Sequence, residues 1–205
     1  MGSNADPTFH RDVEQRFMDH VQLLVEGEEL RLHVSHGFLG RRTARRSIDT
    51  LSPRIVKRDQ AIELKRLMSE MNRPDRSLQQ RMPTGQSMDV DLARTRFGIF
   101  RNTIGYMRVV ALAPMRELIA GQVPPAASRA EVEQAIARLP PISRGLPVTM
   151  VIFSTGGFDA NARDLAHHAD GRTVILVEPN EAGGFNVVGP SQTADINDLF
   201  NPEGV

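Results

Sequence analysis

The clearest hydrophobic pattern in the chain lies between residues 148 and 179, where two apolar runs flank a glycine turn and a short helical stripe. In the first run, residues 148, 150 and 152 share one strand face and residues 151 and 153 share the other, and all five are apolar. Residues 173–177 form a second continuous apolar run. Four residues between the runs have helical spacing: Ala162, Leu165, Ala166 and Ala169. The pattern predicts a parallel βαβ unit and therefore an α/β fold with a mixed sheet.

The N-terminal part of the chain has mainly helical periodicity. Residues 9–25 and 59–71 each carry an apolar stripe, whereas residues 30–34 alternate as a half-buried strand does. Residues 37–58 are rich in Arg and are expected to be irregular, with a short helix near 43–48. Residues 1–92 are therefore predicted to be a largely helical region, and residues 93–205 are predicted to form the α/β domain. One interpretation is that the helical region is a separate lobe.

Shorter signals complete the prediction. Residues 72–91 are polar and are expected to form a mobile loop. Strands are expected at 106–112 and 185–188, a short helix at 115–120 and a last helical turn at 196–200. Ser128 and Glu131 have the spacing of a capping box, and they open a helix whose apolar stripe runs to Leu139.

Composition limits the function classes. The 205 residues include no Cys, which excludes disulfides, thiolate metal sites and a cysteine nucleophile, and a cytoplasmic protein is the simplest expectation. No run of 18 apolar residues occurs, so no membrane partner is expected.

Charge is distributed unevenly although the formal net charge is zero. Residues 41–108 contain 16 Arg and Lys against 7 Asp and Glu, hence +9, and residues 109–205 contain 6 against 11, hence −5. The candidate contacts to phosphates of a nucleic acid are basic residues early in the positive segment: Arg41, Arg42, Arg45, Arg46, Arg54, Lys57 and Arg58. The alternative is a solvated basic face that pairs with the acidic half, within one chain or between the chains of a homo-oligomer.

The turn after residue 153 is a candidate ligand site, because ligands of open α/β sheets bind at the carboxyl ends of strands. Its residues are Ser154, Thr155, Gly156 and Gly157. Backbone N–H groups in such a turn bind phosphate. The alternative is a tight structural turn with Asp159 as the helix cap.

Metal-binding patterns are weak, and no cofactor is predicted. Asp89 and Asp91 would share a Mg²⁺ ion if their segment is extended, which leaves Mg²⁺ as the one metal to consider. Glu63-Leu64-Lys65 lies in a helical pattern, where positions i and i+2 do not face each other. The pairs His33/His36 and His167/His168 are too few to complete a zinc site.

Within residues 148–179, the segments 151–154, 157–158, 162–166 and 174–177 resemble the end of the restriction-endonuclease-like domain of Mrr-type proteins. The resemblance covers about 32 of the 205 residues. It implies a nucleic-acid-associated protein whose catalytic Asp and Glu/Gln-x-Lys lie on strands upstream. Residues 94–147 contain no such pattern, so a non-catalytic protein is expected. The alternatives are a small-molecule- or phosphate-binding domain that uses the 154–157 turn, and an assembly subunit.

Overall fold

A computed structural model describes residues 5–26, 50–96, 100–139, 146–166, 168–169 and 172–189. Several predicted features lie outside these residues: the strand at 30–34, the Arg-rich segment up to residue 49, His33, His36, His167 and the turn at 196–200. In the described part of the chain, no helix is both long and apolar enough to cross a membrane.

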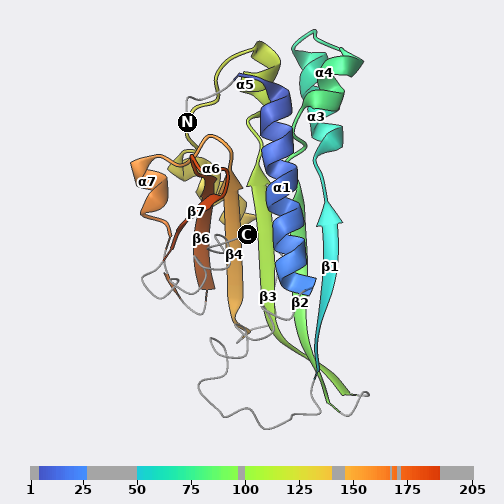
Figure 1. Ribbon diagram of the computed structural model, residues 1–205, viewed down its shortest axis with the longest axis vertical. Helices are drawn as coiled ribbons and strands as arrows, with labels where there is room; N and C mark the ends of the chain where they lie inside the picture. Colours follow the sequence, from blue (N-terminus) through green and yellow to red (C-terminus); the bar gives the residue numbers. More distant parts are fainter. Residues whose placement is uncertain are drawn as a thin grey trace.

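Among the described residues, one seven-stranded mixed sheet forms the centre of the molecule (Figure 1). Its strands are β1 (Thr50–Arg58), β2 (Ser87–Arg96), β3 (Phe100–Leu112), β4 (Val148–Ser154), β5 (His168–Ala169), β6 (Arg172–Pro179) and β7 (Phe185–Val188). The order is β1-β2-β3-β4-β6, with β5 and β7 both pairing with the outer side of β6. β1, β2 and β3 are antiparallel, whereas β3, β4 and β6 are parallel. The α/β fold with a mixed sheet is therefore confirmed.

The helices lie on both faces of the sheet and beyond one end of it (Figure 1). They are α1 (Pro7–Glu26), α3 (Ala61–Glu70), α4 (Arg76–Arg81), α5 (Met115–Ala120), α6 (Arg129–Ala137) and α7 (Ala160–Arg163). On the α1 face, Phe17 stacks on Phe153 with ring centroids 4.2 Å apart. On the opposite face, Val132 and Ala135 of α6 pack with Met150 and Ile152 of β4. A third core joins α3 to α5 through Leu64 and Leu118, among others.

Most helices that were predicted from an apolar stripe or from a capping residue are present. The helices expected at 9–25 and 59–71 are α1 and α3, and those at 115–120 and after Ser128 are α5 and α6 with its capping box. The βαβ unit is present because β4 and β6 pair in parallel. Its helix is shorter than predicted, since α7 ends at Arg163 and Ala169 belongs to β5.

Two predicted irregular segments are wrong. Residues 72–91 contain α4, capped by the side chain of Asp75, and the start of β2, where Met88 and Val90 are 0% exposed. Residues 50–58 form β1, in which Ile55 packs against the α1 core. Both strands are polar on one face, which conceals them in the sequence pattern. Pro53 is tolerated because β1 is an edge strand. The domain boundary expected at residue 92 falls within β2, and one sheet contains strands on both sides of it.

Candidate functional site

The antiparallel half of the sheet has one apolar and one polar face. Met88, Val90 and Val109 point toward α1 and are buried in its core. Alternation of side chains along a strand places their neighbours on the opposite face. On that face, Arg54 and Val56 of β1 pair with Asp91 and Asp89 of β2. On the other side of β2, Asp89 pairs with Arg108 and Asp91 with Tyr106 of β3. Arg54, Val56 and Arg58 are exposed, so this polar sheet face is accessible along the edge strand.

Asp89 is the centre of a cluster on the polar sheet face. It accepts a hydrogen bond from the Tyr106 hydroxyl, and the guanidinium groups of Arg58 and Arg108 each lie 3.5 Å from its carboxylate. Burial raises the pKa of Tyr106, and the hydrogen bond and negative charge of Asp89 raise it further, so the phenol stays protonated and donates. The cluster carries a net charge of +1 from two Arg and one Asp.

The Mg²⁺ hypothesis for Asp89 and Asp91 meets its first condition, because β2 is extended and both residues lie on the same face. The carboxylate of Asp89 is nevertheless already engaged by Tyr106 and two arginines. Within the described ranges, no group of three or more His, Cys, Asp or Glu side chains lies close enough to hold a metal ion. Glu63 and Lys65 lie on helix α3, where they do not face each other.

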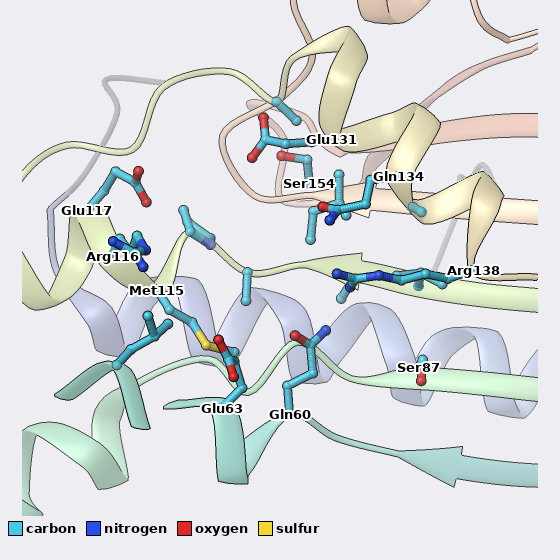
Figure 2. Close-up of a pocket in the computed structure, with 18 of the residues that line it drawn as sticks. Gln60, Glu63, Ser87, Met115, Arg116, Glu117, Glu131, Gln134, Arg138 and Ser154 are labelled. Carbon is cyan, nitrogen blue, oxygen red and sulfur yellow. The ribbon is translucent and has the colours of Figure 1, made fainter. Parts of the chain in front are cut away.

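A cleft of about 320 Å³ adjoins the polar sheet face (Figure 2). Its floor is formed by Val110 and Leu112 at the end of β3 and by Ala113, which directly follows this strand. Its walls carry polar side chains from α3, α5 and α6 and from the residues that flank them: Gln60, Glu63, Arg116, Glu117, Glu131, Gln134 and Arg138. Ser87 and Arg108 from the strands and Ser154 from the end of β4 complete the lining.

Arg108 connects the cleft with the Asp89 cluster. Its side chain is only 13% exposed, and its Nε is buried without a hydrogen-bond partner in the part of the chain described here. On the opposite wall, hydrogen bonding to Arg66 lowers the pKa of Glu63, and the charges of Arg116 and Arg138 lower it further. The cleft therefore contains ionised groups of both signs.

The turn at Ser154–Gly157 is packed against other parts of the protein. The Thr155 hydroxyl lies 2.6 Å from Nδ1 of the buried His10. A Cβ atom on Gly156 would lie 2.7 Å from the carbonyl oxygen of Pro125. Gly157 has a φ of +75°, and its amide donates to the carbonyl of Ser154. These contacts are those of a tight structural turn.

A carboxylate of the protein itself occupies the position next to this turn. Glu178 accepts a hydrogen bond from the Phe158 amide and two from the guanidinium of Arg163, at 2.7 and 2.8 Å. The Asp159 amide donates to the Ala127 carbonyl. The turn therefore has an internal anion beside its N–H groups, and only Ser154 reaches the cleft.

The basic candidates separate in space. Arg54 and Arg58 share the polar sheet face, but Lys57 has the alternation of Ile55 and lies on the α1 face. Arg41, Arg42, Arg45 and Arg46 lie outside the described residues.

Sequence reasoning missed a buried carboxylate that holds the backbone just before Ser87, a residue that lines the cleft. Glu14 of α1 is 1% exposed and accepts hydrogen bonds from the amides of Gly85 and Gln86, just before Ser87. Burial raises the pKa of Glu14 to about 7, against the lowering effect of these hydrogen bonds. One feature of the sequence could have indicated this buried acid: Glu14 directly follows Val13, which belongs to the apolar stripe of the helix.

Sequence reasoning also missed Tyr106, Arg108 and Arg138 as site residues. Arg108 interrupts an apolar strand run and Arg138 follows the last turn of α6, so neither belongs to a recognisable motif. Comparisons with protein-family models, curated proteins and solved structures found no match, so the site is interpreted from this chain's own residues.

Proposed function

We propose that the protein binds nucleic acid without cleaving it, through the antiparallel half of its sheet. The supporting observation is the distribution of charge among the strands. β1, β2 and β3 together contain seven Arg and Lys and two Asp, hence +5. β4, β6 and β7 contain one Arg and one Glu, hence zero. Such a basic region attracts the phosphates of a nucleic acid regardless of sequence.

The edge strand provides the most accessible part of this region. Arg54 and Arg58 share a face and lie four residues apart, which corresponds to about 13 Å along a strand. The Arg58 side chain is 63% exposed, so it reaches a phosphate without a change in the fold. The Asp89 carboxylate does not oppose an anion strongly, because Arg58 and Arg108 offset its charge.

The resemblance to Mrr-type domains supports the same class of partner, and the residues on β2 and β3 favour binding without catalysis. Asp89 faces Arg108 and Asp91 faces Tyr106 across these strands. β3 carries Tyr106 and Arg108 at alternate positions on this face, and residues 94–147 contain no Glu/Gln-x-Lys pattern. Arg108 pairs with the carboxylate of Asp89, which leaves this carboxylate less available to a metal ion.

The test is duplex DNA binding at about 50 and 200 mM salt, with and without Mg²⁺, with the DNA recovered and sized on a gel. We expect binding that weakens by orders of magnitude over this range and intact DNA in both conditions. Absence of binding at low salt would remove the proposal. Cleavage with Mg²⁺ would refute the non-catalytic part alone.

A pair of charge-matched variants assigns the binding to a surface. Arg54→Gln/Arg58→Gln removes two exposed cations from β1, whereas Arg129→Gln/Arg172→Gln removes two exposed cations elsewhere. We expect the first variant to weaken binding and the second to leave it close to wild type. Equal effects would indicate that net charge alone, and not the polar sheet face, determines binding.

A further inference from the structure

The charged groups of the cleft are not evenly mixed. Figure 2 shows Ser87 and Arg138 at one end, and Arg116 and Glu117 at the other. Arg108 belongs to the Ser87 end, because it lies two residues before Val110, the sheet partner of Ser87. We call the part of the cleft that is lined by Ser87, Arg108 and Arg138 the Arg108 end.

The Arg108 end has an excess of positive charge. Arg108 and Arg138 line this end, and Arg58 adjoins it through Asp89. The carboxylates that interact with these three arginines are Asp89 and Glu63, and Glu63 is also paired with Arg66, so cations remain in excess. Within the described residues, Arg138 forms no ion pair and the Nε of Arg108 has no hydrogen-bond partner. Glu63, on the facing wall, forms ion pairs with Arg66 of its own helix.

A dianion with several acceptor oxygens complements this end. A guanidinium group presents a rigid fork of N–H donors that matches phosphate oxygens. A phosphate monoester has a charge of about −1.5 to −2 at neutral pH and three strong acceptor oxygens, whereas a carboxylate has one charge and two oxygens. Two guanidinium groups and the Ser87 hydroxyl therefore fit a phosphate group better than a carboxylate.

The remainder of the cleft is too large for phosphate alone. Its volume of about 320 Å³ lies in the range of small-molecule sites. Val110, Leu112 and Ala113 form an apolar floor, and Figure 2 shows Gln60 and Gln134 on opposite sides of β3. A flat ring with a polar edge would cover such a floor and bond with the amides.

We propose that the cleft binds a phosphate monoester of nucleotide size, with its phosphate at the Arg108 end and its ring on the floor of β3. This site differs from the exposed surface of β1, and it stands whether or not the polar sheet face binds nucleic acid.

The experiment is isothermal titration of the full chain with adenosine and cytidine monophosphates, the corresponding nucleosides and inorganic phosphate. The test variant is Arg138→Gln, which changes an exposed side chain directly after α6. The matched control is Arg129→Gln, which changes an exposed arginine at the start of the same helix. We expect at least one monophosphate to bind about tenfold to a hundredfold more tightly than its nucleoside, because charge-assisted hydrogen bonds are lost without the phosphate. Arg138→Gln should weaken this binding to a similar extent, and Arg129→Gln should not.

Three results would overturn the proposal: no binding of any monophosphate, equal binding of monophosphate and nucleoside, or no effect of Arg138→Gln. Competition identifies the source of the phosphate group. Displacement by a single-stranded oligonucleotide with a 5′-phosphate, but not with a 5′-hydroxyl, points to the end of a nucleic acid strand, and displacement by neither points to a free nucleotide. Monophosphate binding without duplex DNA binding would support the cleft site and refute the proposed function. Duplex DNA binding without monophosphate binding would refute the cleft site and support the proposed function.

Discussion

The buried carboxylate of Glu14 makes a specific prediction about stability and pH. Its folded pKa of about 7 lies above the ordinary value of 4.5, because burial disfavours the charged form. Between these two values the folded state therefore holds a proton that the unfolded state has released. The contribution of Glu14 to stability is fully present below pH 4.5 and decreases as the pH rises to about 7.

The magnitude follows from the shift of about 2.5 between the two pKa values. At 1.36 kcal/mol for each pKa unit, the free energy of unfolding should fall by about 3 kcal/mol across this window because of Glu14 alone. Glu14→Gln removes the titration. The single amide oxygen cannot replace both carboxylate oxygens as acceptors from Gly85 and Gln86, which lowers the stability of the variant by about 1 kcal/mol independently of pH. Residue 14 then makes no pH-dependent contribution to the free energy of unfolding.

The assay is urea unfolding of wild type, Glu14→Gln and the control Glu26→Gln, which alters an exposed acid on the same helix. Measurements run from pH 4.5 to pH 8. The stability of wild type relative to Glu14→Gln should decrease by about 3 kcal/mol as the pH rises, whereas Glu26→Gln should parallel wild type. A stability difference between wild type and Glu14→Gln that does not change with pH would refute the reasoning. A difference that increases with pH would mean that the pKa of Glu14 is lowered in the folded state.

The remaining predictions concern the βαβ unit and its surroundings. Gly156→Ala should destabilise the protein by about 1–3 kcal/mol, because the new methyl group meets the Pro125 carbonyl; chemical denaturation showing no change would contradict this. Arg163→Gln should cost about 2 kcal/mol, because Glu178 loses two hydrogen bonds from a charged donor, and Arg163→Gln/Glu178→Gln should recover part of this loss. Ser128→Ala should lower stability by about 1 kcal/mol through loss of the cap on α6, and a melting temperature equal to that of wild type would argue against the cap.

Much of the fold follows from local patterns in the sequence. The stripe through Val13 and Phe17 predicts α1, and the spacing of Ser128 and Glu131 predicts the start of α6. The two apolar runs of the βαβ unit predict β4 and β6, because strands buried on both faces are continuously apolar. These signals are local, so they do not depend on which other element covers them.

β1 and β2 were missed because their apolar residues alternate with polar or charged ones, whereas residues 106–112 of β3 were expected as a strand. Met88 and Val90 read as isolated apolar residues in a polar segment until β1 and β3 are placed beside them. Ile55 likewise gains its partner only from the distant helix α1. The pairing across three strands, and with it the polar sheet face, is a tertiary property.

The candidate site was harder to predict for the same reason. Arg54 and Arg58 were recognised as basic, but their common face, opposite that of Lys57, depends on the strand conformation. Arg108 and Arg138 come together at the cleft from positions 30 residues apart in the sequence, with no motif to connect them.

The most direct test of the proposed function is the salt dependence of duplex DNA binding for wild type and Arg54→Gln/Arg58→Gln. Each phosphate contact contributes about −0.9 to the slope of log K against log salt concentration. Loss of two contacts should therefore make the slope shallower by about 1.8 and weaken binding at every salt concentration. An unchanged slope in the double variant would show that these arginines do not contact phosphate and would contradict the assignment of binding to the polar sheet face.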